Sequence, residues 1–512
     1  VEQKSQGEQS GFMRRAAWLT GANVVSFALS FAAPLLIVRL LSQSEFGVYK
    51  QSFQILSTAL AVLNFQVASS TYYFMPRMPD KKLQVAMNVI LFYAVAGLLL
   101  ALAFVIYPQW ATAIFHSADV AEHVPLLGVA ILFWLVSANL EVMPLAMGDV
   151  RTASVFIVAA QLSKSALIIG AALIFRTVHA VMWAAVLQGV FQAALTLGYI
   201  RRRCGSFRKP LDWPLFKAQI GNAIPYGVGS IAQNLQNDLH NYFVSFFFPP
   251  ALFAVYAVGC FQLPLLGLLQ GSFNSVLIPE VAQLEAAGDR QGIVNVWFNA
   301  MRKLALAFLP AFALMFVVRR ELITLLFTQK YADSVAIFGI FLFGLIPSMI
   351  LTGPILRAFA EFRFFRLKLY LALLPITCLG LYVGIKSGGL IGAITAVVAL
   401  QMLEAALTLV AIGRKLGVTA KDFKQLAPMI PTALAALAAA LVVLMAKTAL
   451  AQHVPVIILL AVCGLVFSAV YVVVGLAVGA ITTSEKIELY GAVQRGYRIG
   501  AARMGLSSTT QA

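Results

Sequence analysis

The sequence predicts an all-α polytopic membrane protein with about fourteen transmembrane helices. Apolar residues make up 61% of the 512 residues and charged residues only 11%, whereas soluble globular chains contain about 45–50% and about 25%. The mean hydropathy of +0.88 applies to the whole chain, so the apolar excess is not that of a single anchor. Because each membrane crossing needs about 20 apolar residues, this composition can supply the predicted spans.

Proline, glycine and charge clusters mark the ends of the candidate helices. The helices are predicted near residues 12–41, 47–75, 83–107, 124–147, 152–175, 178–200, 216–248, 251–281, 293–318, 333–356, 367–385, 389–412, 426–446 and 455–480. The pair Gly388-Gly389 marks a tight turn between the eleventh and twelfth spans. An even number of spans places both ends of the chain on one side of the membrane.

The basic residues predict the orientation. A net charge of +17 would suggest nucleic acid in a soluble protein, but the positive-inside rule accounts for it in a membrane protein, so no nucleic-acid partner is expected. With the N-terminus in the cytoplasm, 28 of the 37 Lys and Arg residues fall inside, 8 fall outside and Lys164 lies within a span. The apolar stretch after Arg14-Arg15 runs to Leu41 without a small-residue cleavage site, so it is predicted to be the first span and not a secretory signal.

Two short patterns recur in the two halves of the first twelve spans. Phe46-Gly47-Val48-Tyr49 opens the second span, and Phe253-Ala254-Val255-Tyr256 opens the eighth. Trp110–Phe115 follows the third span, and Leu322–Phe327 follows the ninth. Together they predict a six-span duplication with parallel repeats, because six is even.

The predicted organisation follows from this duplication and from the basic segment between its halves. It comprises a cytoplasmic N-terminal tail (1–11), an N-lobe of six helices (12–200), a basic cytoplasmic linker (201–215), a C-lobe of six helices (216–412), two further helices with their preceding loop (413–480) and a cytoplasmic C-terminal tail (481–512).

The seventh span carries a polar stripe. Its polar residues recur at three- and four-residue steps: Asn222, Tyr226, Ser230, Gln233, Asn234, Asn237 and Asn241, with Gln236, Asp238 and His240 nearby. At 100° per residue, this pattern predicts a helix with a wide polar face and an apolar face toward lipid. We interpret the polar face as a cavity wall, and the alternative is a set of interhelical hydrogen bonds. The first span has a narrower stripe that contains Asn23 and Ser26.

Lys164 lies at the centre of the fifth span, near Gln161. A cation at the bilayer midplane costs about 2.5–3.5 kcal/mol, so it is expected to be paired or exposed to water. One hypothesis is an ion pair with Asp238 or Glu141, and the other is a cation that faces the substrate. Asp238 is also the best candidate for a coupling-ion or proton site.

Three basic residues lie near two other predicted span ends: Arg302, Lys303 and Arg357. They either line an inner cavity mouth or anchor helices at the membrane interface. The full set of substrate-binding candidates is Lys164, Gln161, Asn23, Ser26, Asn222, Tyr226, Gln233, Asn234, Asn237, Asp238, Asn241, Arg302, Lys303 and Arg357. No catalytic motif appears in a supporting context, and the four cysteines lack metal or redox spacing. The sequence therefore predicts neither an enzyme nor a metal or cofactor site.

The segment Arg39-Leu-Leu-Ser-Gln-Ser-Glu-Phe-Gly-Val-Tyr49 is similar to the opening of bacterial oligosaccharide (Wzx-type) flippases. These form the polysaccharide transporter family of the multidrug/oligosaccharidyl-lipid/polysaccharide exporter (MOP) superfamily. The superfamily plan of two six-span lobes, with two extra helices in some members, covers the whole chain. The resemblance implies translocation of undecaprenyl-diphosphate-linked oligosaccharide across the bacterial inner membrane by alternating access. It also implies membrane lipids, and the polymerase and export machinery of the same pathway, as partners.

Other functions remain open at this point. A cation-coupled multidrug exporter and a lipid II flippase share the superfamily plan, and Asp238 is compatible with the exporter. A membrane glycan polymerase or ligase would have similar hydropathy, but such enzymes typically carry a large outer loop. The longest predicted outer loops here, at 108–123 and 319–332, are short.

Overall fold

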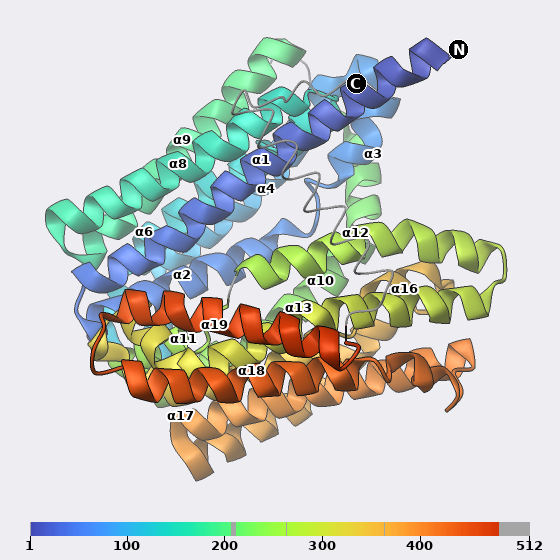
Figure 1. Cartoon of the computed structure of the whole chain (residues 1–512). Helices are drawn as coiled ribbons and strands as arrows, with labels where there is room; N and C mark the ends of the chain where they lie inside the picture. Colours follow the sequence, from blue (N-terminus) through green and yellow to red (C-terminus); the bar gives the residue numbers. More distant parts are fainter. Residues whose placement is uncertain (1, 206–210, 263, 363, 481–512) are drawn as a thin grey trace, which may run out of the picture. The chain divides into compact units, whose positions relative to one another are not determined.

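The computed structural model describes residues 2–205, 211–262, 264–362 and 364–480. All regular structure within these ranges is α-helix or short 3-10 helix (Figure 1), so the all-α prediction is confirmed. Part of the predicted linker, 206–210, and the predicted C-terminal tail, 481–512, lie outside the described residues.

The helices follow one another with short connections. The α-helices are α1 (Glu2–Leu40), α2 (Gln43–Asn64), α3 (Ser70–Arg77), α4 (Lys82–Ile106), α5 (Trp110–Phe115), α6 (Ala118–Val136), α7 (Val142–Ala146), α8 (Val150–Phe175), α9 (Val178–Cys204), α10 (Trp213–Phe247), α11 (Pro250–Gly259), α12 (Pro264–Ala286), α13 (Arg290–Phe327), α14 (Ser334–Phe341), α15 (Leu345–Ser348), α16 (Gly353–Ala358), α17 (Phe365–Leu416), α18 (Met429–Leu450) and α19 (Val456–Ala477). Short 3-10 helices lie at Pro79–Lys81, Ser137–Asn139, Gln329–Tyr331, Leu342–Gly344, Ala360–Phe362 and Asp422–Leu426.

Within the described residues, 10 helical segments are long and apolar enough to cross a membrane. They are Trp18–Leu40, Pro79–Ile106, Ala118–Ala146, Val150–Phe175, Val178–Cys204, Leu265–Ala286, Arg290–Phe327, Ala360–Leu416, Asp422–Leu450 and Val456–Ala477. The helices α2 and α10 have sufficient length but carry many polar residues. The chain is therefore a multi-pass membrane protein, and the count of fourteen spans stays a prediction.

The predicted turn at Gly388-Gly389 is confirmed within α17. Gly389 has φ 57° and ψ −133°, a conformation that favours glycine. A Cβ on Gly384 or on Gly392 would overlap the carbonyl oxygen of the other residue. These residues would be about 12 Å apart in a straight helix. The two halves of α17 therefore fold back and pack against each other through glycine.

Four other predicted helices are interrupted. The range 47–75 is divided between α2, which ends at Asn64, and α3, which begins at Ser70. The range 124–147 is divided between α6, which ends at Val136, and α7, which begins at Val142. The range 251–281 is divided between α11, which ends at Gly259, and α12, which begins at Pro264. The range 333–356 contains α14, α15 and α16. Proline explains the last two breaks, because it lacks an N–H and disfavours helical geometry at the preceding residue. Between α2 and α3 no proline is present, and the helix ends where Phe65 (φ 42°) and Gln66 (φ 56°) adopt left-handed conformations.

The start of α2 shows why the motif at residues 42–49 has its sequence. Ser42 Oγ accepts a hydrogen bond from the Glu45 backbone (3.2 Å), and the Glu45 carboxylate accepts one from the Ser42 backbone (2.8 Å). This capping box satisfies two backbone donors at the helix start. Gly47 approaches the Pro250 carbonyl so closely that a Cβ would overlap it. The two copies of the repeated motif therefore lie on two helices, α2 and α11, that pack together.

The chain divides into two compact units. The first unit comprises Val1–Pro264, Leu326–Phe341 and Ala360–Glu404, and the second comprises Leu265–Leu325, Leu342–Phe359 and Ala405–Ala512. In the second unit, α18 and α19 pack on α13 through a cluster that contains Val318, Val443 and Phe467. The two six-helix lobes stay a prediction.

Candidate functional site

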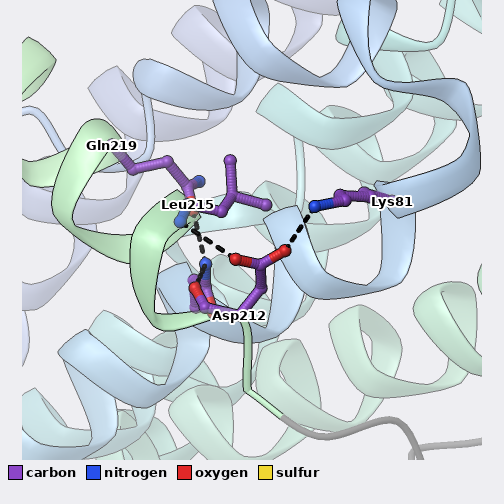
Figure 2. Close-up of polar contacts among 5 residues, drawn as sticks. Lys81, Asp212, Leu215 and Gln219 are labelled. Atoms are coloured by element: carbon purple, nitrogen blue, oxygen red, sulfur yellow. Dashed lines mark hydrogen bonds and ion pairs between the residues drawn. The ribbon is translucent and has the colours of Figure 1, made fainter.

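The start of α10 is fixed by polar contacts with the helices that precede it (Figure 2). Asp212 caps the helix by accepting a hydrogen bond from the Leu215 backbone (3.0 Å), and its other carboxylate oxygen pairs with Lys81 Nζ (2.7 Å). The side-chain amides of buried Gln219 and Asn88 lie 2.8 Å apart, and Gln219 donates to the Val85 carbonyl (3.2 Å). Since buried polar groups need partners, these contacts determine which face of α10 turns toward α4.

The ion pair also perturbs the Asp212 carboxyl group. The hydrogen bond from Lys81 and the backbone hydrogen bond from Leu215 stabilise its ionised form and hold its pKa below the ordinary value. An ionised carboxylate at a helix start also interacts favourably with the helix dipole.

Three neighbouring helices contact the polar stripe of α10. Gln54 on α2 lies within hydrogen-bonding reach of Asp238 and accepts a hydrogen bond from Asn241 (3.5 Å). His240 Nδ1 is 2.9 Å from the Tyr256 hydroxyl on α11. Gln236 donates to the Thr377 hydroxyl on α17. This part of the stripe forms interhelical hydrogen bonds, as the alternative interpretation expects.

Another part of the stripe is not covered by protein within its unit. Asn222, Asn234 and Asn237 are exposed, and Gln233 is half-buried. An asparagine that faces acyl chains would leave its amide without hydrogen-bond partners, which is unfavourable in lipid. These positions favour contact with water or with a polar ligand. The side chain of Tyr226 lies outside the described part of the structure.

A small polar cavity lies between α10 and α17. Its lining includes Gln236, Asn237, His240, Thr377, Gln401 and Glu404, and its volume is about 40 Å³. Since one water needs roughly 10–15 Å³ by this measure, the cavity holds a few waters or a small ion but no saccharide. Glu404 also lies within hydrogen-bonding reach of the Tyr370 hydroxyl. Among the described residues, no group of three or more His, Cys, Asp or Glu side chains could hold a metal ion.

Lys164 on α8 has an aromatic neighbour in place of an acidic one. Its Nζ lies 4.8 Å from the centroid of the Trp134 ring on α6. The Trp134 indole donates to the Ala185 carbonyl (3.0 Å), which fixes the ring. The side chain is half-buried, and no described carboxylate lies within ion-pairing distance of it. The hypothesis of an ion pair with Asp238 or Glu141 is therefore wrong.

The other candidates are dispersed. Gln161 donates to the Ser165 hydroxyl on the same helix (3.3 Å). On α1, Asn23 is exposed and Ser26 is half-buried. Arg302, Lys303 and Arg357 belong to the second unit, where Arg302 donates to Asn299 (3.2 Å) and Arg357 is exposed at the end of α16. The structure therefore brings Asp238 and Asn241 together at Gln54, and Lys164 lies elsewhere.

The sequence analysis missed the partners of the α10 stripe. Thr377 is an isolated polar residue in an otherwise apolar stretch. Gln54 follows Lys50 and Gln51 and precedes Ser57 and Thr58 at three- and four-residue steps, so this spacing was a signal for a polar face of α2. Glu404 carries a stronger signal, because acidic residues are rare within membrane spans. Trp134 gives no signal, since its contact with Lys164 depends on tertiary packing.

Comparisons with known proteins identify a family and a fold. Residues 75–336 match the model of a family described as "Polysaccharide biosynthesis protein". No curated protein matches the chain. Among solved structures, lipid II flippase MurJ in the inward closed conformation is similar, with a TM-score of 0.58 and 13% identity over 88% of this chain and 98% of that chain.

Two further solved structures share the architecture. An inward-facing multidrug resistance MATE family transporter of the MOP superfamily has a TM-score of 0.59 and 13% identity, over 77% of this chain and 94% of that chain. A MOP superfamily transporter from Pyrococcus furiosus Vc1 has a TM-score of 0.56 and 12% identity, over 79% of this chain and 95% of that chain. At such low identity these likenesses establish the MOP-type fold alone.

Proposed function

The chain belongs to the polysaccharide biosynthesis protein family, and from this premise we propose that it is a flippase for undecaprenyl-diphosphate-linked oligosaccharide. The lipid-linked repeat unit moves from the cytoplasmic to the outer leaflet of the bacterial inner membrane, where polysaccharide is assembled. Both chain ends lie in the cytoplasm, and the chain catalyses no covalent step. Its partners are the lipid-linked substrate, membrane lipids and the polymerase and export machinery of the pathway.

The observation that carries this proposal is the environment of Lys164. Lys164 is a half-buried cation in an apolar helix, held against Trp134 with no carboxylate of the described residues in ion-pairing distance, and such a cation favours binding of an anion. The diphosphate is such an anion. Its polyprenyl chain stays in lipid, and the saccharide needs polar surroundings such as the exposed asparagines of α10. Outward movement of negative charge is also favourable in an inside-negative potential, by about 2.3 kcal/mol per charge per 100 mV.

In the proposed mechanism, two six-helix lobes alternate between access from the inside and from the outside. Lys164 and Gln161 bind the diphosphate. Asn23, Ser26, Asn222, Tyr226, Gln233, Asn234, Asn237 and Asn241 provide polar contacts for the saccharide, and Arg302, Lys303 and Arg357 attract the anionic headgroup at the inner mouth.

Asp238 is the proposed coupling-ion site. Its neighbours Gln54 and Asn241 provide amide oxygens, which are suitable ligands for a hard cation. This acidic group also supports a second candidate function, a cation-coupled multidrug exporter. Asp238→Asn distinguishes the two: in a flippase it weakens glycan export, whereas in a drug exporter it lowers resistance to toxic cations and leaves the glycan unchanged.

The experiment that tests the flippase begins with removal of the gene. The lipid-linked oligosaccharide that accumulates in the inner leaflet then identifies the substrate. Complementation with Lys164→Ala is expected to reduce glycan export by at least about tenfold, because a charge-assisted contact contributes roughly 1.5–3 kcal/mol. Lys164→Arg should retain most of the export.

Lys50 offers a matched control for loss of a half-buried lysine. Its Nζ lies 5.6 Å from the centroid of the Phe46 ring, so its environment also includes an aromatic face. Lys50 differs from Lys164 in position, because it lies near the start of α2, on the side predicted to be outside, and not at the centre of a predicted span. Lys50→Ala is therefore expected to leave export near the wild-type level. Full export by Lys164→Ala, with folded protein at normal levels, would remove Lys164 from the mechanism.

A further inference from the structure

A second groove lies along α8 and α9, apart from the polar cavity at α10. Its volume is about 650 Å³, which is in the range of small-molecule sites. Phe156 and Leu195 line its apolar part, and Arg202 and Arg203 lie at the end where α9 finishes. The groove is therefore apolar beside Phe156 and Leu195 and basic at the end of α9.

The two arginines at this end have different electrostatic environments. Arg203 pairs with Asp149 (Nη2 to Oδ2, 2.7 Å), and its guanidinium lies 6.0 Å from the Tyr199 ring centroid. Asp149 also accepts hydrogen bonds from the Thr152 backbone (3.2 Å) and hydroxyl (2.9 Å). Arg203 is therefore oriented and neutralised. Arg202 is exposed, and among the described residues no carboxylate pairs with it.

The Asp149 carboxyl group remains ionised at neutral pH. Partial burial raises its pKa, but the hydrogen bonds from Thr152 and the positive charge of Arg203 outweigh this effect and lower the pKa overall. The ion pair thus holds the α8 start against the α9 end at neutral pH, while the charge of Arg202 remains in excess.

Gly198, which lines the groove, has free space beside it. No heavy atom lies within 4 Å of the place where a Cβ would stand at this residue. The small side chain of Ala194 continues the same face of α9, one turn away. An extended hydrocarbon chain can therefore lie along α9 with its end group near Arg202.

We propose that this groove binds a lipid whose phosphate headgroup has a net negative charge, with the phosphate at Arg202 and an apolar chain along Phe156 and Leu195. The positive-inside rule assigns this end of α9 to the cytoplasmic surface, and basic pockets between helices at this surface suit anionic headgroups. The proposal does not depend on transport. Two lipids have the required chemistry: phosphatidylglycerol, with a phosphodiester, and undecaprenyl diphosphate.

Native mass spectrometry of the full chain in detergent tests the site. Phosphatidylglycerol, undecaprenyl diphosphate and zwitterionic phosphatidylethanolamine are added in separate arms, and the retained lipid is counted. Wild-type protein is expected to retain at least one anionic lipid in preference to phosphatidylethanolamine. The arm with the stronger retention identifies the natural class of ligand.

Arg202→Gln is expected to lower this retention about fivefold, the effect of one basic residue at a membrane surface. Arg201→Gln is the matched control, because Arg201 is exposed and adjacent but does not line the groove. Gly198→Phe fills the groove and should lower retention as well, whereas Gly170→Phe on α8, also in open space, should not.

Equal retention by the Arg202→Gln and Arg201→Gln variants would overturn the proposal, as would equal retention of phosphatidylethanolamine and the anionic lipids by wild-type protein. Both arginine variants change exposed side chains, so they are expected to fold. The proposal therefore remains testable if Gly198→Phe does not fold.

Discussion

Two lysines of the apolar helices, Lys447 and Lys164, differ in how their charge is satisfied. Lys447 on α18 pairs with Glu321 on α13 (2.8 Å) and donates to the Val317 carbonyl (2.9 Å). The Lys447 and Glu321 side chains are only 18% and 14% exposed. Lys164 on α8 has the face of Trp134 and no described carboxylate in ion-pairing distance.

The difference distinguishes a structural cation from one that is available to a ligand. Lys447 joins two helices of the second unit and has its charge neutralised within the protein. Lys164 contacts an aromatic face, which contributes about 0.5–2 kcal/mol, but within the described part of the chain its charge has no counter-ion. Substitutions at the two positions should therefore affect different properties.

Lys447→Met should give the largest loss of stability. It leaves Glu321 buried without its partner, which costs about 3–5 kcal/mol for a buried pair. Thermal unfolding of the purified protein in detergent measures this loss. The double variant Lys447→Met/Glu321→Leu should recover most of it, and failure to recover would show that the pair is not the cause.

Lys164→Met should change the free energy of unfolding by less than about 1 kcal/mol, or stabilise the protein. The lost cation–π contact is offset by removal of a charge that is costly at membrane depth. The same variant should reduce glycan export strongly. A loss of stability as large as that of Lys447→Met would make Lys164 a structural residue and contradict the comparison.

The pair Lys81–Asp212 should have the smallest effect, because the Lys81 side chain is 50% exposed and solvent screens the pair from that side. Asp212 has a lowered pKa in the folded chain, so its contribution is present above the unfolded-state pKa near 3.9 and is lost as the pH falls through the folded-state value. Wild-type protein should therefore lose more stability below about pH 4 than Asp212→Asn, which retains a capping side chain. Identical acid profiles would show that the pair contributes nothing.

Local patterns were sufficient for some features of the fold. The turn at Gly388-Gly389 follows from glycine chemistry, and the polar stripe of α10 follows from helical periodicity. The interruptions between α11 and α12 and within 333–356 were missed, because proline breaks a helix in some contexts and only bends it in others. The extension of α13 to Phe327 was also missed, since the helix continues through Arg319-Arg320.

Less of the candidate site than of the fold could be predicted from the sequence. Periodicity identifies the polar face of α10, but it does not show that Gln236 contacts Thr377 or that Asp238 lies beside Gln54. These partners come from helices that are distant in sequence, so their pairing depends on tertiary packing. The same reason explains why an acidic partner was considered for Lys164 when the structure has Trp134.

The most direct test of the proposed flippase uses proteoliposomes that contain the purified chain and fluorescent undecaprenyl-diphosphate-linked oligosaccharide in both leaflets. A glycan-degrading enzyme added outside reports the fraction of the oligosaccharide that reaches the outer leaflet. The account predicts nearly complete degradation with wild-type protein, only slightly more than half with Lys164→Ala over the same time, and about half in vesicles without protein. Protection of the inner half in vesicles that contain folded wild-type protein, with an imposed potential and ion gradient, would contradict it.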